Sequence, residues 1–480
     1  MSPYPIVRAA AAVIAFALAA CGRSSPPPPS PICALPTPQA SALPAAQVLR
    51  LGAHGVGETV SFQVPPGTGS VTIVQQGTQP SAAQTVTHQG EVLGNTVVPW
   101  TVKVGGTEFY NDGAVVPADP ATWGTPNGIG SIYFGTEAVW TGSMTVPNTT
   151  NMLDYVDAHG GVPSGSWSVE VNDYARECRG TTGCVVGDGK SGYPAGSYDV
   201  TVLLKTGPVV STGTLDVTFY LVTDRLDAAT APASGSVARM EQTLAGYLAG
   251  AGISLGTVRF VDLPPATKAR FAAGVDTDDT SPCGEVASVL QTSGPGNTMN
   301  LFLVNHLAST QVGTTRVVGV DGTIPGPSSV GGTVASGALV SVEDLAVGQG
   351  TTACAGAVNL AGCGADGTAY VAAHETGHFL GLYHPTESYG TLFDPVKDTP
   401  TCACTACAPP TQVASCLQSG KPGASTYEVT GADCTKQLSN PSSPCGGGEN
   451  LMFWLRSAVR STGALTAQQS RILRANALVE

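Results

Sequence analysis

The sequence predicts an α+β domain built on a mixed sheet, preceded by an all-β sandwich or jelly-roll domain. Three observations lead to this expectation. Residues 48–212 hold short β-branched runs between Gly and Pro turns, and residues 213–480 alternate strand-like with helix-like segments. One of the helix-like segments carries histidines at metal-ligand spacing, so we expect the chemistry of the chain in 213–480.

The chain begins with a segment typical of export. Arg8 precedes an apolar run that ends at Leu18-Ala19-Ala20-Cys21, and this run is too short to span a bilayer. These four residues resemble a bacterial lipobox, in which the cysteine becomes the lipidated first residue. We therefore expect a lipoprotein signal peptide over 1–20 and lipidation at Cys21, with a plain secretory signal as the alternative.

Residues 21–47 are rich in Pro, Ser and Ala. This composition favours extended polyproline II and cannot bury a core, so it is typical of a tether. We expect a protein of the bacterial cell envelope, lipid-anchored to the membrane, or a secreted one. Gly22 after the cysteine favours the outer membrane. A short propeptide, in which Cys33 caps a metal, is the alternative to the tether.

Segment 48–212 is predicted to form the sandwich as a single accessory domain. Its segment 165–173 is similar to jelly-roll modules. No residue in it suggests chemistry, so substrate or surface binding, assistance in folding and latency all stay open as its role. Strands are expected at 60–64, 70–74, 167–171 and 198–202.

Segment 213–480 is predicted to alternate strands and helices. A helix is expected over 234–249, because Met240, Leu244 and Leu248 recur at four-residue steps. Strands are expected at 217–222, 257–261 and 299–304, and further helices at 371–382 and 467–478.

The stretch His374-Glu375-Thr376-Gly377-His378-Phe379-Leu380-Gly381-Leu382-Tyr383-His384 supplies three ligands for one metal ion. His374 and His378 lie one turn apart on one helix face. Gly381 tolerates the left-handed conformation that ends a helix, and the turn brings back His384 as the third ligand. Three protein ligands leave one tetrahedral position open, which is typical of a catalytic zinc.

Glu375 follows the first ligand, where a carboxylate can act as general base on a water molecule that the metal activates. The chain has 7 His, so three of them at these offsets, with the Glu and the Gly, form a specific signal. A buried helix whose histidines only pack is one alternative. A degenerate, metal-free copy of such a site is the other.

The motif resembles that of the metzincin zinc peptidases, HExxHxxGxxH followed by a methionine turn. Met452 is the one methionine after the motif, in Asn450-Leu451-Met452-Phe453-Trp454. The resemblance implies that Met452 lies beneath the metal, with ordinary core packing as the alternative. For residues 213–480 it implies a metzincin-like fold with a zinc helix and a Met-turn.

Two further stretches are similar to the pappalysin family of metzincins. That family carries Tyr two residues after the methionine, where this chain has Trp454. An indole N–H only donates, so the part of Trp454 in catalysis is open. The residue after the third histidine, Pro385, is instead similar to the serralysin branch, which is the alternative subfamily. The pappalysin-like stretches are Asp394-Pro395-Val396-Lys397-Asp398-Thr399-Pro400 and Leu465-Thr466-Ala467-Gln468-Gln469 with Arg471 and Leu473.

The resemblance implies a zinc endopeptidase that hydrolyses a protein or peptide substrate with one catalytic Zn²⁺. It also implies Ca²⁺ at Asp394 and Asp398, with solvated turn aspartates as the alternative.

An extended substrate would add to an exposed sheet edge. The candidate for that edge is segment 330–342, and the alternative is that this segment forms an ordinary surface loop. The alternative function is an inactive peptidase scaffold that serves as a surface binding or adhesion module.

The cysteines predict an oxidising compartment. There are 13, and 13 − 1 leaves 12 without Cys21, enough for up to six disulfides. We expect Cys178 to pair with Cys184 and Cys354 with Cys363. A second metal at Cys404 and Cys407 is the alternative to a disulfide-stapled loop, which a secreted chain favours. The cysteines after the zinc helix are Cys402, Cys404, Cys407, Cys416, Cys434 and Cys445.

Composition argues against a nucleic-acid partner. Only 11% of the residues are charged, the net charge is −13, and no cluster of Lys and Arg stands out. Binding to phosphates needs such clusters. The sequence leaves the oligomeric state and the cleavage preference open.

Overall fold

The computed structural model describes most of the chain from residue 38 onward. Cys21 and Cys33, with the rest of the predicted signal peptide and most of the tether, lie outside the described residues. No helix in the described part is both long and apolar enough to cross a membrane. The described residues are 38–55, 57–77, 86–88, 91–93, 95–111, 141–178, 184–186, 197–278, 284–309, 316–345, 364–387, 393–403, 406, 411, 445–455 and 463–480.

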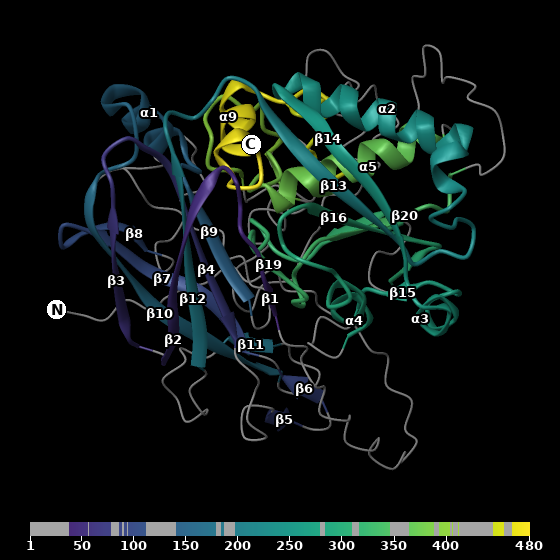
Figure 1. Ribbon diagram of the computed structural model, residues 1–480, viewed down its shortest axis with the longest axis horizontal. Coiled ribbons are helices and arrows are strands. Elements are labelled where there is room, and N and C mark those ends of the chain that lie inside the picture. Colours follow the sequence, from purple (N-terminus) through teal and green to yellow (C-terminus); the bar gives the residue numbers. More distant parts are fainter. Residues whose placement is uncertain are drawn as a thin grey trace.

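Two antiparallel sheets pack against each other in the first part of the chain (Figure 1). Exposed and buried residues alternate along one strand, 59–64, which turns Val60, Phe62 and Val64 towards Trp167 in the core. The strands expected at 60–64, 70–74, 167–171 and 198–202 are all confirmed within longer ones.

The bounds of these strands are as follows. The first sheet has the order β11 (Cys184–Val186), β10 (Gly165–Cys178), β7 (Asn95–Val104) and β8 (Thr107–Asn111), with β3 (Thr59–Val64) also paired to β10. The second has the order β2 (Ala46–Gly55), β12 (Ser197–Thr206), β4 (Thr68–Gly77) and β9 (Thr141–Val146). A separate pair is formed by β5 (Val86–His88) and β6 (Glu91–Leu93).

Segment 48–212, predicted as all-β, also contains a helix, α1 (Thr150–His159). Its N-cap Thr149 accepts a hydrogen bond from the backbone N–H of Met152, and its C-cap Gly160 has a φ of 73°. Both are ordinary helix-ending signals. The helix is short and lies between strands, so periodicity alone gives it a weak signal.

The second part of the chain is built on a five-stranded mixed sheet. Neighbouring strands are parallel except the last pair, in which β18 runs antiparallel to β20. The strands expected at 217–222, 257–261 and 299–304 are confirmed, although the first two begin earlier than predicted. The order is β14 (Ile253–Asp262), β13 (Gly213–Leu221), β16 (Met299–Val304), β20 (Ala338–Ser341) and β18 (Gly319–Asp321).

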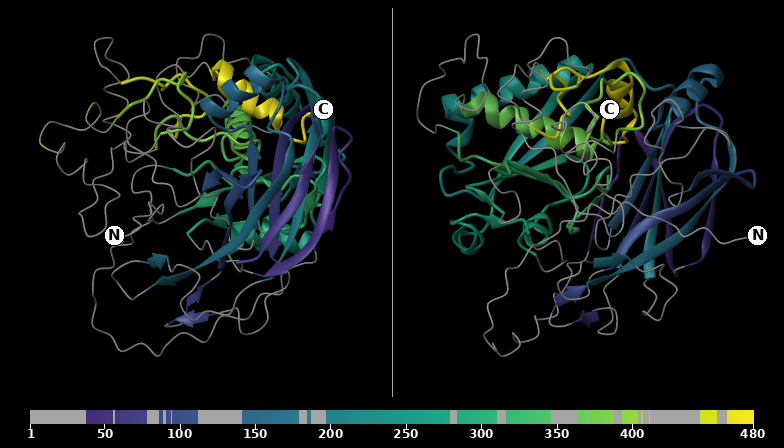
Figure 2. Two further views of the ribbon diagram at one scale, coloured as in Figure 1. Left: turned by 90° about the vertical axis from the view of Figure 1, so that its left-hand side faces the viewer. Right: turned by 180° about the vertical axis from the view of Figure 1, so that it is seen from behind.

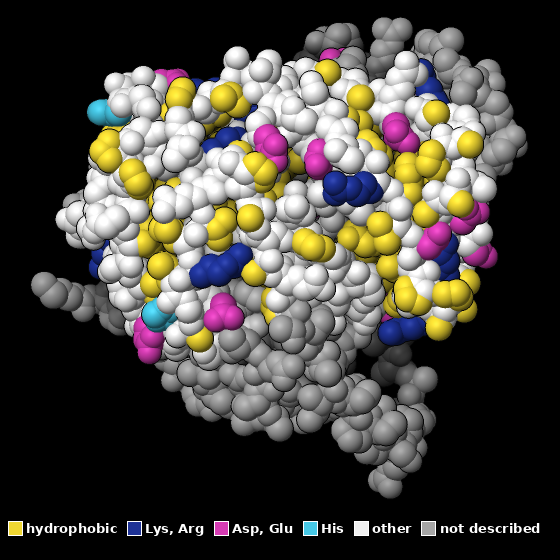
Figure 3. All heavy atoms as spheres, in the orientation of Figure 1, with side chains coloured by type: hydrophobic (Ala, Val, Ile, Leu, Met, Phe, Trp, Pro, Cys, Tyr) yellow, Lys and Arg dark blue, Asp and Glu magenta, His cyan; other side chains and the backbone are white. Residues whose placement is uncertain are grey.

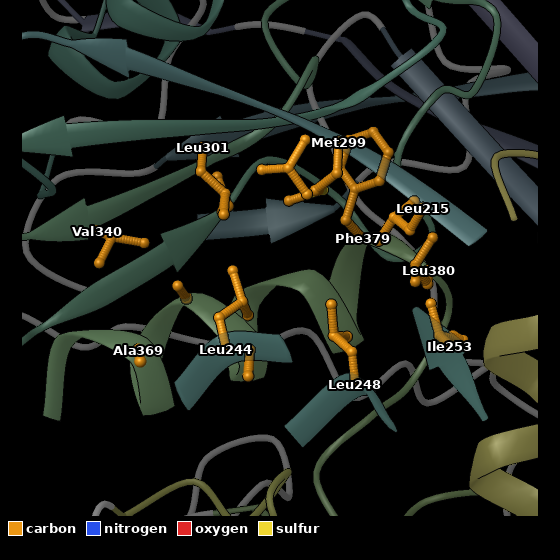
Figure 4. Packing of buried hydrophobic residues seen from close by; sticks show 14 of the residues in the cluster. Leu215, Leu244, Leu248, Ile253, Met299, Leu301, Val340, Ala369, Phe379 and Leu380 are labelled. Carbon is orange, nitrogen blue, oxygen red and sulfur yellow. The ribbon is translucent and has the colours of Figure 1, made fainter. Parts of the chain in front are cut away.

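Two helices, α2 (Gly235–Gly250) and α5 (Gly364–Phe379), cover one face of this sheet (Figure 1). Figure 4 shows Leu244 and Leu248 of α2 directed towards the same core as Val340 of the sheet. The helix expected over 234–249 is thus confirmed. The remaining elements are η3 (Ala231–Ala233), α3 (Pro265–Arg270), α4 (Glu285–Leu290), α9 (Ala467–Ala475) and the pair β15 (Val275–Asp276) with β17 (Leu307–Ala308).

Ordered structure begins before residue 48. Strand β1 (Gln39–Ala40) pairs antiparallel with β19 (Val330–Gly331). Leu43 is 5% exposed and belongs to the core of the second part of the chain. The tether predicted over 21–47 is therefore wrong for residues 38–47, because their backbone and an apolar side chain find partners in the fold.

Segment 330–342 was also predicted wrongly as the sheet edge for a substrate. All of its residues are buried, β19 pairs with β1, and β20 lies between β16 and β18. The outermost strand on this side of the sheet is β18. The pattern of Gly, Val and Ser in 330–342 thus reflects close burial rather than an exposed edge.

Helix α9 and the C-terminal residues lie between the sandwich and the mixed sheet (Figure 2). Lys205 of β12 donates through Nζ to the carbonyls of Arg474, Asn476 and Val479. The C-terminal Glu480 exchanges two backbone hydrogen bonds with Thr214. The sandwich therefore contacts the same helix that closes the second part of the chain.

Charged side chains are sparse on the surface. On the face in Figure 3, the Lys and Arg side chains are few and scattered, and some lie beside Asp and Glu side chains. This distribution agrees with the 11% of charged residues in the sequence.

Candidate metal centre

Helix α5 carries the first two histidines and ends at Phe379, three residues before the predicted end at 382. Gly381 follows with a φ of 115°, a conformation that glycine adopts without steric cost. The N–H of Leu382 then donates to the carbonyl of Gly377 at 2.9 Å. This tight turn directs His384 back towards the two helical histidines.

Each histidine ring is held through Nδ1. His374 Nδ1 donates to the carbonyl of Leu451 at 2.7 Å, and His378 Nδ1 donates to that of Leu382 at 2.7 Å. His384 Nδ1 donates to Oε2 of Glu387 at 2.9 Å. Carbonyl and carboxylate oxygens only accept, so the proton of each neutral ring stays on Nδ1 and the lone pair is on Nε2.

The three Nε2 atoms converge on one point. They lie 3.2 Å apart between His374 and His384, 3.1 Å between His374 and His378, and 3.1 Å between His378 and His384. Three lone pairs at such distances repel one another unless a cation lies among them. Tetrahedral zinc with Zn–N of about 2.0–2.1 Å would separate its nitrogens by about 3.3 Å. The three histidines therefore form a cluster that can hold one metal ion.

Burial keeps the rings in the form that binds metal. Desolvation, followed by the neighbouring His384, lowers the pKa of His374 to about 3. The pKa of His378 is also lowered well below its usual value, first by burial and then by the other two histidines. Rings that stay neutral at neutral pH keep their Nε2 lone pairs available, as metal ligation requires.

Glu375 is a buried carboxyl beside the histidines, with 6% of its surface exposed. Burial raises its pKa to about 8, and a bound cation would act in the opposite direction. Strand β18 lies directly against it. A Cβ at Gly319 would sit 2.2 Å from Glu375 Oε1, so a larger residue there would displace the carboxyl group.

A second carboxyl, Asp321, stands two residues further along β18. Its Oδ1 atom is shielded from solvent and has no hydrogen-bond partner among the described residues. Burial, and then the charge of Glu375, raise the pKa of Asp321 well above its usual value. The strand thus places two carboxyl groups within electrostatic reach of each other at the site.

Met452 lies beneath the helix that carries the ligands. It is fully buried, and a Cβ at Gly377 would sit 2.3 Å from its Sδ atom. The preceding residue, Leu451, provides the carbonyl that binds His374. Tyr370 Oη donates to the same carbonyl at 3.1 Å. The segment around Met452 therefore supports one ligand ring directly.

The other residues predicted from the resemblance have different surroundings. Trp454 is half-buried, and its ring lies 6.2 Å from that of Phe453. Asp394 accepts a hydrogen bond from Thr399 Oγ1 at 2.6 Å, whereas Asp398 accepts one from the N–H of Gln468 at 2.9 Å. Among the described residues, no cluster of three His, Cys, Asp or Glu side chains includes these aspartates, and Ca²⁺ there stays a prediction.

One predicted group of cysteines is partly described. Cys402 and Cys445 form a disulfide across a sequence separation of 43 residues. The backbone register of β10 and β11 sets Cys178 opposite Cys184, and their disulfide stays a prediction. The other cysteines after α5 lie outside the described residues, as does the predicted pair of Cys354 with Cys363.

Sequence reasoning missed three residues of the site. Glu387 follows His384 by three residues, and a carboxylate close to a metal-binding histidine is a signal that could have been used. Gly319 and Asp321 had no such signal, because the sheet brings them to the site from a distant part of the chain.

Comparison with known proteins adds little to this description. No family model matches the chain, and no curated protein does. A crystal structure of metalloproteinase-II from Bacteroides fragilis is similar at a TM-score of 0.22 and 12% sequence identity, covering 47% of this chain and 73% of that chain.

Proposed function

We propose that this protein is a zinc endopeptidase of the metzincin type, most like the pappalysins. The observation that carries the proposal is the convergence of three Nε2 lone pairs with the buried Glu375 beside them. Each ring donates through Nδ1 to an oxygen, which directs Nε2 towards the shared point, and three imidazole nitrogens suit Zn²⁺. Three ligands leave one coordination position for water or substrate.

Bound Zn²⁺ would polarise a peptide carbonyl and lower the pKa of water towards neutrality. Glu375 takes the proton of the attacking water and returns it to the leaving amine. Gly319 allows the backbone of β18 to lie against the carboxylate, which limits the positions that its oxygens can take. The carbonyl of Leu451 and the carboxylate of Glu387 keep their imidazoles oriented for ligation.

The substrate is proposed to bind as an extended strand along β18. This strand pairs only with β20 among the described strands, and a substrate strand would pair with its other edge through backbone hydrogen bonds. Glu375 lies against Gly319 of this same strand, on the face of the sheet that α5 covers. A peptide added there would therefore pass close to the general base.

The proposal extends to the N-terminal part of the chain, on sequence alone. We propose lipidation at Cys21 and a position in the bacterial cell envelope, with secretion as the alternative. The sandwich would then stand between the anchor and the peptidase.

A second candidate is an inactive peptidase scaffold that binds other molecules at the cell surface. The hydrogen bonds of Lys205 in the sandwich to the carbonyls of Arg474, Asn476 and Val479 would hold the two parts of such a scaffold together. The two functions differ in whether Glu375 takes part in chemistry.

The test compares Glu375→Gln with Glu58→Gln, an exposed position in the sandwich. Glu375→Gln should lower kcat for casein or peptide cleavage by about 10²–10⁴-fold, as for loss of a general base. It should keep its zinc, because Glu375 is not a ligand. Glu58→Gln should cleave like the wild type. Equal cleavage by the two variants would show that Glu375 is not the base and refute the mechanism.

A further inference from the structure

A buried polar network connects helix α9 with the turn beneath the metal centre. At its middle is Gln469, which has no exposed surface. Its Oε1 accepts from Asn450 Nδ2 at 2.8 Å, and its Nε2 donates to Asn450 Oδ1 and to Asp394 Oδ2, both at 3.4 Å. Asp394 itself accepts from Thr399 Oγ1 at 2.6 Å. Every one of these side chains is buried.

The network ends at a metal ligand. Asn450 Oδ1 accepts from the N–H of Met452 at 2.8 Å, which fixes the turn on both sides of Leu451. The carbonyl of Leu451 in turn accepts from His374 Nδ1 at 2.7 Å. Three hydrogen bonds therefore connect Gln469 with the ring of His374. They join Gln469 to Asn450, Asn450 to the N–H of Met452, and the neighbouring carbonyl of Leu451 to His374.

Gln469 also belongs to the N-terminal cap of α9. Its N–H donates to Thr466 Oγ1 at 3.2 Å, and its Oε1 accepts from the N–H of Thr466 at 3.1 Å, which is a capping box. An amide can accept from two N–H groups with its oxygen and donate with its nitrogen at the same time. A Met side chain at position 469 could neither accept nor donate these hydrogen bonds. A carboxylate at position 469 would have no proton to donate to Asp394.

We propose that Gln469 is a positioning residue of the metal centre, which orients His374 through Asn450 and the carbonyl of Leu451. Outer hydrogen-bond partners of a ligating histidine set the direction of its lone pair and thereby the affinity for the metal. The inference requires only that the three histidines bind a metal. It does not require that the protein cleaves peptides.

The matched controls lie on the same helix. Gln468 is the same residue type one position earlier, and its side chain accepts from Thr150 of α1 instead of bonding to the turn. Thr466→Ala removes half of the capping box but leaves the bonds between Gln469 and Asn450. A loss that appears in Gln469→Met alone is therefore due to the contact with the turn and not to destabilisation of α9.

The experiment measures zinc affinity of the full chain by competition with a chromophoric chelator, and the visible spectrum of the Co²⁺-substituted protein. Gln469→Met should weaken zinc binding by about 10- to 100-fold and change the Co²⁺ bands, which report ligand geometry. Gln468→Met and Thr466→Ala should stay within about twofold of the wild type with unchanged bands, since they leave the outer partners of His374 in place.

Asn450→Ala provides a second route to the same contact if Gln469→Met does not fold. It should give the same loss of affinity, and the double variant Gln469→Met with Asn450→Ala should lose less than the sum of the two single losses in binding free energy. Equal zinc affinity and equal Co²⁺ bands in Gln469→Met, Asn450→Ala and Thr466→Ala would overturn the proposal. Absence of zinc binding in the wild type would overturn both this proposal and the peptidase, whereas zinc binding without peptide cleavage would refute the peptidase alone.

Discussion

The sulfur of Met452 packs directly against Gly377, so that a side-chain methyl group at position 377 would clash with it. A Cβ at Gly377 would be 2.3 Å from Sδ and 3.0 Å from Cε of Met452. Gly377 is on α5 directly before His378, and Leu451 next to Met452 holds His374. The contact therefore joins the helix that carries two ligands to the turn that orients one of them.

Gly377→Ala should destabilise the protein by about 1–3 kcal/mol, as overpacking does in a dense core. The matched control is Gly246→Ala on α2, where a Cβ would meet no atom within 4 Å. That substitution should stabilise by about 0.5–1 kcal/mol, because alanine favours a helix interior. The measurement is the free energy of unfolding by denaturant. Similar stability in both variants would contradict the packing of Met452 described above.

Glu387→Ala should weaken zinc binding by about 10- to 100-fold, because His384 Nδ1 loses its acceptor. Glu387→Gln keeps a carbonyl oxygen that can accept the same hydrogen bond, so it should recover most of the affinity. Competition with a chelator gives both values. If Gln at this position were as harmful as Ala, the carboxylate would act by its charge and not by orienting the ring.

Lys205→Met should lower the free energy of unfolding by about 2–4 kcal/mol, because buried carbonyls at the end of α9 lose their donor. Lys205 is 6% exposed and donates to three of them. Lys103→Met, at an exposed position in β7, is the control and should change stability by less than about 0.5 kcal/mol. Equal effects would mean that the sandwich does not support the C-terminal helix through Lys205.

Lys205 also predicts a pH dependence of stability. Burial, followed by the charge of Arg474, lowers its pKa from 10.5 to about 8. Between these two values the unfolded chain binds the proton that the folded chain has released, so stability rises with pH in this window. The free energy of unfolding of the wild type should therefore rise relative to that of Lys205→Met between pH 8 and 10.5. A relative fall would reverse the sign and contradict the lowered pKa.

Much of the local structure could be predicted from the sequence, since it depends on neighbours in the chain. Helix α2 and the strands at 217–222 and 299–304 followed from apolar periodicity. The placing of His384 beside His374 and His378 followed from their spacing and from Gly381, with a φ of 115°. These features depend on interactions between residues that lie close together in the sequence.

The features that were missed depend on long-range contacts. The position of β18 against Glu375 and the burial of 330–342 follow from strand order, which local patterns do not specify. Gln469 had a usable local signal, because Thr466-x-x-Gln469 is a capping box. Its link to Asn450 had none, since the turn and the helix meet only in the folded chain.

The most direct test of the proposed function measures zinc content and peptide cleavage in one sample of the purified wild-type protein. We predict one zinc per chain, cleavage at internal peptide bonds, loss of both on chelation, and recovery of both with one equivalent of zinc. One zinc per chain without cleavage of any member of a broad peptide library would contradict the peptidase and favour the binding scaffold.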